Sequence, residues 1–201
     1  MKIIEIKRNI YNRIYRMKLK NKDFSIISSN CNGGVLLSDL GIKFNTPTIN
    51  LFFYPEDYLR FLGNIKENLK FELREEKDDR FNYPIGNLNG IKIHFMHYTT
   101  FDEAKVKWEE RKQRINYNNI FIIFTDRDGC TYKQMKKFDE LPYKNKVIFT
   151  HKEYPEIQSS YYIKGFENEN SVGILSEYIG NTCKRYLYKF DFIKWLNEGK
   201  I

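Results

Sequence analysis

Short apolar runs alternate along the chain with segments in which apolar residues recur every three or four positions. Residues 24–30, 49–53, 119–125 and 146–150 have the length and composition of buried strands. The run at 119–125 is apolar on both faces, which is typical of a central parallel strand. Helical spacing between the runs predicts helices over residues 35–40, 55–70, 101–115 and 132–141.

Residues 71–98 interrupt this alternation. The part at 71–90 is charged and rich in turn-forming residues, which predicts a hairpin or an exposed excursion. In the strand predicted at 91–98, His97 continues the apolar face, whereas His94 shares the other face with Lys92 and is expected to point away from the core. A strand at 160–164 and helices near 171–180 and at 191–198 complete the chain. The whole pattern predicts a three-layer α/β/α fold, in which helices cover both faces of a mixed, largely parallel sheet.

The first residues form an amphipathic unit of their own. Apolar side chains recur at spacings of three and four from Ile3 to Met17, with basic residues mostly between them, which predicts a helix over residues 3–19. We therefore divide the chain into a basic amphipathic helix, residues 1–22, and a single α/β domain, residues 23–201. Two interpretations stay open: the helix docks on the domain with its basic face in solvent, or it attaches peripherally to an anionic membrane surface or an acidic partner.

The formal net charge of +8 belongs mainly to this N-terminal segment. Residues 1–22 hold eight basic residues and one acidic residue, a net of +7, so the rest of the chain is close to neutral. No zinc-finger, RRM, KH or P-loop pattern accompanies the charge. These observations argue against nucleic acid as a partner.

Cysteine usage and hydropathy indicate a reducing compartment. Three cysteines without C-x-x-C spacing argue against a disulfide framework and a structural zinc site. No apolar run has the length of a membrane span, and the N-terminus lacks the apolar core of a signal peptide. We expect a cytoplasmic protein, peripheral at the inner face of the membrane if the helix binds lipid.

The strongest candidate for chemistry follows the first strand. Cys31 is the predicted nucleophile, because a strand-to-helix turn offers backbone N–H groups and a helix N-terminus that favour a thiolate and can hold an oxyanion. The plainer interpretation is an inert residue in a tight turn. The glycines that follow permit positive φ and close approach of a ligand. The residues predicted to bind substrate here are Ser29, Asn30, Asn32, Gly33 and Gly34.

Two histidines are candidate bases. His97 is the first choice because a titratable ring on an apolar face needs a polar partner, and His151, just past a strand, is the reserve. The plainer interpretation of His97 is a hydrogen-bonded core histidine. On the charged segment at 101–115, Arg111 and Arg114 are candidates for contacts with an anionic ligand, and a solvated helix face is the plainer interpretation.

A D-x-D triplet ends the strand at 119–125. Asp126 and Asp128 are predicted catalytic residues: they could share a divalent cation that bridges a nucleotide-sugar diphosphate, or orient a histidine. Arg127 between them is a candidate for substrate binding, and a plain turn at Asp128 is the alternative. Because ligands collect at the carboxyl ends of strands, we expect the strand ends after residues 30, 95 and 125 to bring Cys31, His97 and Asp126 together.

Several longer motifs occur in a fixed order over about residues 22–165. They are Ser28-Ser29-Asn30-Cys31-Asn32-Gly33-Gly34, Asn45-Thr46-Pro47-Thr48, Pro55-Glu56-Asp57-Tyr58, Tyr83-Pro84-Ile85-Gly86, Ile93-His94-Phe95-Met96-His97-Tyr98, Asp126-Arg127-Asp128-Gly129-Cys130-Thr131 and Phe138-Asp139-Glu140-Leu141-Pro142. This series resembles the bacterial family known as domain of unknown function 1919. The resemblance implies an α/β/α fold and, because members occur in exopolysaccharide, capsule or lipopolysaccharide loci, a role in building or decorating a surface glycan. Asn32 departs from the family pattern, in which we expect an aromatic residue, commonly tryptophan.

Three functions remain open. The first is a transferase acting on a glycan precursor, with acyl transfer through Cys31 and proton handling by His97 with Asp126 or Asp128. The second is a metal-dependent glycosyl or phosphoglycosyl transferase in which Asp126 and Asp128 bind the cation and Cys31 is structural. The third is a non-catalytic scaffold of a polysaccharide assembly. The expected partner is a glycan precursor or nucleotide-sugar, the donor is acyl-CoA or a nucleotide-sugar, and a divalent cation belongs to the second function alone.

Overall fold

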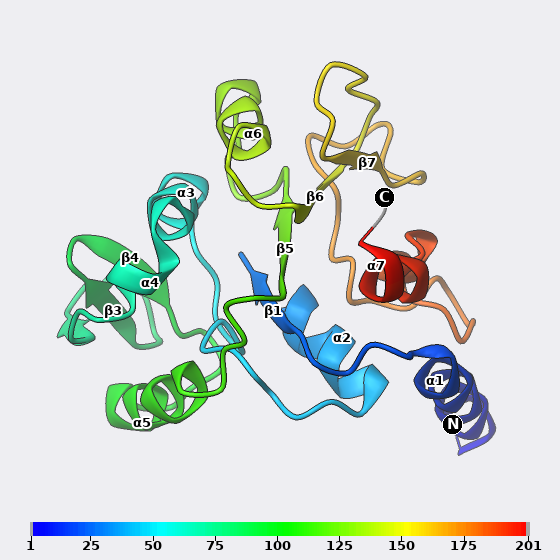
Figure 1. The fold of residues 1–201 in the computed structure, drawn as a ribbon, viewed down its shortest axis with the longest axis horizontal. Helices are drawn as coiled ribbons and strands as arrows, with labels where there is room; N and C mark the ends of the chain where they lie inside the picture. The colour runs from blue at the N-terminus through cyan, green and yellow to red at the C-terminus, as the bar shows by residue number, and fades with distance from the viewer. Residues whose placement is uncertain (1, 200–201) are drawn as a thin grey trace.

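The computed structural model describes residues 2–199 and contains two β-sheets (Figure 1). Sheet A has four parallel strands in the order β1 (Ser25–Ser28), β5 (Ile120–Thr125), β6 (Asn145–Thr150) and β7 (Ser160–Tyr162). Sheet B is antiparallel, in the order β2 (Arg74–Glu76), β3 (Ile85–Leu88) and β4 (Ile91–His94). The predicted α/β class with a largely parallel sheet is confirmed, and its antiparallel part is a separate sheet.

Helices cover both faces of sheet A and give the fold its layers. On one side lie α1 (Lys2–Lys18), α2 (Asn32–Leu40) and α7 (Phe192–Glu198); on the other lie α3 (Pro55–Gly63), α4 (Ile65–Asn68), α5 (Phe101–Lys112) and α6 (Tyr132–Asp139), together with sheet B (Figure 1). Side chains of β5 alternate between two cores, since Ile122 and Phe124 pack on the α3 side and Phe121 and Ile123 on the α2 side. A strand buried on both faces needs apolar residues throughout, which explains the composition of this run. None of the helices within residues 2–199 combines the length and apolarity that a bilayer span requires.

Local signals set several helix boundaries. α6 begins at a complete capping box formed by Thr131 and Gln134, and α7 lies where a helix was predicted. The helix predicted over 55–70 is divided at Asn64, whose side chain caps α4. The prediction of a helix near 171–180 is wrong: these residues form turns, with one isolated bridge from Tyr178 to Arg185. Their backbone groups bond outside the segment, to the side chains of Asp126 and Arg185 and to the backbone of residues 184–187. A short 3₁₀ helix, η1 (Tyr186–Lys189), follows them.

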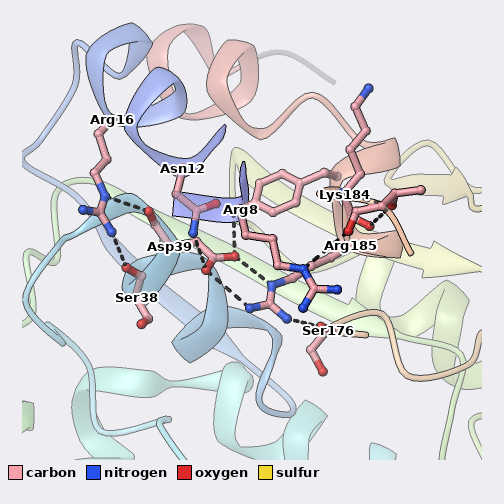
Figure 2. Close-up of polar contacts among 10 residues, drawn as sticks. Arg8, Asn12, Arg16, Ser38, Asp39, Ser176, Lys184 and Arg185 are labelled. Carbon is pink, nitrogen blue, oxygen red and sulfur yellow. Dashed lines mark hydrogen bonds and ion pairs between the residues drawn. The ribbon is translucent and has the colours of Figure 1, made fainter. Parts of the chain in front are cut away.

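The predicted N-terminal helix is present as α1, but its apolar stripe does not dock it. Figure 2 shows Asn12 Nδ2 donating to a carboxylate oxygen of Asp39 at 3.0 Å and Arg16 Nε donating to the Asp39 carbonyl at 2.9 Å. Asp39 is buried in α2 and is paired with Arg185 at 2.8 Å. The polar face of α1 is therefore the docked face, and these apolar side chains are exposed: Ile3, Ile6, Ile10, Ile14 and Met17.

His94 is buried in an aromatic cluster, so the prediction that it points away from the core is wrong. Its ring stacks on Phe52 with 4.5 Å between centroids, and Phe81 and Tyr83 pack against its edges. Phe52 reaches this face of β4 because residues 49–53, predicted as a strand, contribute an isolated bridge from Phe52 to His94. Burial, with a smaller contribution from nearby Lys92, lowers the pKa of His94 to about 4.

The buried imidazole makes stability depend on pH. Between pH 6.5, where the histidine of the unfolded chain gains a proton, and about 4, where His94 does so in the fold, the unfolded state binds more protons. The free energy of unfolding should therefore fall as the pH falls through this range, by up to about 3 kcal/mol from His94 alone. Urea unfolding at several pH values should show a shallower dependence for His94→Phe than for wild type. His97→Phe, at an exposed site, is the control, and equal slopes for wild type and His94→Phe would contradict the assignment.

Helix α2 lies in direct contact with strand β1 at Gly33. A Cβ atom added there would lie 2.8 Å from Ser28 Cβ and 3.1 Å from Ile26 Cγ2. Neither Gly33 nor Gly34 has a positive φ, so the conformational freedom expected of these glycines is not used. Glycine is required at residue 33 by the close approach of helix and strand.

Gly33→Ala should destabilise the protein by about 1–3 kcal/mol, because Ser28 Cβ cannot move without its strand. Gly63→Ala is the matched control: it is also helical, and its Cβ would meet nothing within 4 Å. The control should be neutral or stabilising by up to about 1 kcal/mol. Urea titrations measure both values, and equal stabilities for the two variants would contradict the close packing.

Candidate functional site

A cleft opens at the carboxyl ends of β1 and β5, the edge where open α/β sheets bind ligands. Its volume is about 440 Å³, which suits a small molecule. The lining residues are Asn30, Cys31, Asn32, Phe52, Met96, His97, Arg127, Asp128, Ile174 and Ser176. The structure thus brings Cys31, His97, Arg127 and Asp128 together, and their chemical roles stay predictions.

Cys31 occupies the N-cap position of α2, and its thiol is partly buried. The Sγ atom lies 4.0 Å from the carbonyl oxygen of Leu51, as a weak hydrogen-bond donor. Burial raises the pKa of the thiol above its ordinary value, and the guanidinium of Arg127 lowers it in part. The prediction that this turn favours a thiolate is therefore wrong, because burial outweighs the nearby positive charge. The thiol is neutral at pH 7 and needs a base to remove its proton before it can attack.

Polar groups next to the thiol fix the turn from β1 into α2. Asn30 Oδ1 accepts from the backbone N–H of Asn32 at 3.2 Å, and Asn30 Nδ2 donates to a threonine hydroxyl at the end of β5 at 3.1 Å. Ser29 is buried and pairs through its backbone with β5. Asn30 and Asn32 line the cleft, whereas Ser29, Gly33 and Gly34 are buried outside its lining.

His97 and the pair Arg127–Asp128 reach the cleft from two turns. β4 ends at His94, so His97 lies in the following turn and is exposed, not on the apolar strand face that the pattern predicts. Asp128 has φ 58°, in the left-handed region that aspartate tolerates better than most residues. Burial raises the pKa of Asp128, and Arg127 lowers it in part. Beside the thiol, the cleft therefore holds an imidazole, a carboxyl group and a guanidinium.

Asp126 does not line the cleft but connects the segments that form it. Its Oδ2 lies 2.8 Å from the backbone N of His151 and 2.6 Å from His151 Nδ1, and its Oδ1 accepts from the Val172 N–H at 2.8 Å. The two backbone N–H groups donate to the carboxylate, and the ring nitrogen of His151 pairs with it. The histidine that Asp126 orients is His151, the reserve base, and not His97. The carboxylate joins the end of β5 to the end of β6 and to residues 171–176, which supply one wall of the cleft.

The two carboxylates of the D-x-D triplet have different surroundings. Both oxygens of Asp126 accept hydrogen bonds from N–H groups away from the cleft, whereas Asp128 lines the cleft. Within residues 2–199, no cluster of three or more His, Cys, Asp or Glu side chains is arranged to hold a metal ion. Side-chain placement therefore does not favour a cation shared by Asp126 and Asp128.

Arg111 and Arg114 lie outside the cleft lining and are engaged elsewhere. Arg111 is buried, and its Nη1 donates to the hydroxyl of Tyr98 at 2.6 Å. Arg114 Nη1 donates to the carbonyl oxygen of Phe44 at 3.0 Å. Both side chains tie the end of α5 to neighbouring segments.

Four lining residues were not anticipated from the sequence: Phe52, Met96, Ile174 and Ser176. Met96 and Ile174 are large apolar side chains that are 44% and 47% exposed, so the rim of the cleft offers apolar surface. The one sequence signal for this wall is the turn-forming composition of residues 168–173, which argues against the helix predicted there. The cleft is suited to a ligand with both charged and apolar parts.

Two comparisons relate the chain to other proteins. A family model described as "Domain of unknown function (DUF1919)" matches residues 2–197. A protein of Haemophilus influenzae (strain Rd), described as "Uncharacterized protein", is 47% identical over 192 residues, which make up 96% of this chain and 93% of the relative. The family match begins in α1 and ends in α7, so it covers both the N-terminal helix and the cleft.

Alkylation of Cys31 tests the electrostatics of the cleft. In a background that carries Cys130→Ser and Cys183→Ser, iodoacetamide should react with Cys31 more slowly than with an exposed thiol, and the pH profile should give a raised pKa. Arg127→Gln should raise that pKa further, because the guanidinium stabilises the thiolate. Arg74→Gln is the control for loss of a positive charge, because Arg74 is exposed and does not line the cleft. If Arg127→Gln leaves the pH profile of alkylation unchanged, the guanidinium does not stabilise the thiolate of Cys31.

Proposed function

The chain belongs to the DUF1919 family, and we propose that its cleft is the active site of a transferase that moves an acyl group from acyl-CoA to a hydroxyl of a glycan precursor. The observation that carries the proposal is the placement of a thiol, an imidazole and a guanidinium in one cleft at the strand ends. The class of acceptor rests on the surface-glycan setting that the family resemblance implies.

The proposed chemistry has two steps in which bonds and protons balance. His97 takes the proton of the Cys31 thiol as the sulfur attacks the thioester carbonyl; a bond from Sγ to the acyl carbon forms, the bond to the CoA sulfur breaks, and CoA leaves with the proton returned by His97. In the second step His97 takes the proton of the acceptor hydroxyl. The oxygen attacks the acyl carbon, the new ester bond forms as the bond from Sγ to the acyl carbon breaks, and His97 returns the proton so that Cys31 leaves as a thiol. Because burial raises the pKa of Cys31, the thiol is neutral at rest, and the scheme requires His97 to remove its proton.

The cleft offers one positively charged side chain and two apolar side chains that are suited to different parts of an acyl donor. Arg127 is half-buried at the lining and acts on the thiol electrostatically, so it is suited to the oxygen of the thioester carbonyl, which becomes negative as the sulfur attacks. The exposed apolar side chains Met96 and Ile174 offer contact area for an acyl chain. Asn32, in the position where an aromatic residue was expected, contributes a side-chain amide to the lining instead.

Incubation with acetyl-CoA followed by peptide mass spectrometry tests the proposal. The wild-type protein should gain one acetyl group on the peptide that contains Cys31, and hydroxylamine should remove it, as expected of a thioester. His97→Gln should slow acetylation by about 10²–10⁴-fold, the usual contribution of a general base. Cys31→Ser should abolish the thiol-bound label.

Matched variants separate this reaction from chance labelling. Cys183→Ser removes a thiol that does not line the cleft and should leave acetylation of Cys31 unchanged. Acetylation of Cys31 no faster than that of Cys183, or an unchanged rate in His97→Gln, would overturn the proposal.

A further inference from the structure

The N-terminal helix is docked in the reverse of the usual orientation. An amphipathic helix on a globular domain normally buries its apolar stripe. In α1 the docked face is polar and aromatic: Asn12 and Arg16 bond to Asp39, and Arg8 donates to the carbonyl of Thr182 at 3.4 Å (Figure 2). The apolar stripe is thereby held away from the domain.

Aromatic packing reinforces this orientation. The Tyr11 and Tyr15 hydroxyls are 2.8 Å apart, and the ring of Tyr15 lies 4.8 Å from that of Tyr188. The guanidinium of Arg8 lies 3.4 Å from the ring centroid of Tyr178. These contacts occupy the inward face of the helix from Arg8 to Arg16, so the helix cannot turn its stripe inward without losing them.

The outward stripe is continuous and well exposed. Its members lie on one side of the helix because they recur every three or four residues. Their exposed fractions are Ile3 72%, Ile6 57%, Ile10 56%, Ile14 39% and Met17 70%. A contiguous apolar stripe that is exposed to solvent indicates an interaction site.

Basic side chains border the stripe on both sides. At 3.6 residues per turn, Lys7 and Lys18 fall along one edge and Arg13 along the other, and all three are exposed. The acidic residue of the helix, Glu5, falls away from the stripe. An apolar stripe between two cationic edges matches an anionic bilayer, in which apolar side chains enter the acyl region while lysine and arginine reach the headgroups.

We propose that α1 binds the surface of a bilayer containing anionic phospholipid, with the helix lying in the plane of the membrane and the isoleucine stripe inserted. Charge selects this occupant over a second copy of the chain. Two copies joined through the stripe would bring their basic edges face to face, whereas the bilayer supplies the opposite charge. The helix is already formed and held on the domain, so binding needs no rearrangement of the fold.

Vesicle co-sedimentation of the full chain tests the proposal. Wild-type protein should bind vesicles of phosphatidylcholine that contain about one third phosphatidylglycerol. Its affinity should be at least about tenfold lower for vesicles of phosphatidylcholine alone, and also for the anionic vesicles at high salt. Ile6→Gln with Ile10→Gln should reduce binding by more than about tenfold, because the apolar insertion is lost. Lys7→Gln with Arg13→Gln should reduce binding to the anionic vesicles and leave the weak binding to phosphatidylcholine unchanged.

A matched control and an independent measurement keep the outcomes distinct. Val106→Gln replaces an apolar side chain of α5 that is 62% exposed, and it should bind as wild type does. Circular dichroism should show equal helix content in all variants, since every replaced side chain is exposed. Wild type that fails to bind the anionic vesicles, or an isoleucine variant that binds as well as wild type, overturns the proposal. A dimer in sedimentation velocity that Ile6→Gln with Ile10→Gln dissociates, without vesicle binding, overturns it in favour of a second copy.

Discussion

The carboxylate of Asp126 is the constraint on which the cleft depends. It is buried at the end of β5 and accepts hydrogen bonds from the end of β6 and from the segment at 171–176. A buried carboxylate without donors would carry a large desolvation penalty, so these segments are held where their N–H groups can reach it. One wall of the cleft, including Ile174, is therefore positioned by a residue that does not line it. The adjacent residues Arg127 and Asp128 then face the cleft because the chain turns sharply after Asp126.

A second buried carboxylate organises the other end of the molecule. Asp39 joins α1, α2 and the segment that carries Arg185, and its charge is balanced by that guanidinium. The segment held by Asp39 also reaches the cleft, since Arg185 donates to the carbonyl of Ser176 and Ser176 lines the cleft. The docking of the N-terminal helix and the wall of the cleft thus share one stretch of chain. The family match over both parts is consistent with their forming one structural unit.

Much of the fold follows from patterns within single segments. Uninterrupted apolar runs predict the parallel strands, and the Thr131 capping box predicts the start of α6, because these signals involve residues that lie next to one another in the chain. The rule for strand ends predicts that Cys31, His97 and Asp126 meet; Cys31 and His97 do line one cleft, but Asp126 lies outside it and its neighbours Arg127 and Asp128 line it instead. Whether these residues act as catalyst stays a prediction. The partners of Asp126 lie 25 and 46 positions further along the chain, and no local pattern specifies them. For the same reason the sequence misplaces His94: alternation predicts two faces of β4 but not that Phe52 and Phe81 cover the second one. In α1 the spacing of the apolar residues correctly predicts a helix with one apolar and one polar face, but it does not predict that the polar face docks, because that depends on Asp39.

A crystal structure of the protein grown with CoA would show directly which surface the acyl donor occupies. If the cleft binds the donor, the pantetheine sulfur of CoA lies at Cys31, next to Arg127, and the cleft between residues 96 and 174 is filled. CoA bound at another surface, or a cleft that stays unoccupied at saturating CoA, would show that the cleft does not bind the acyl donor.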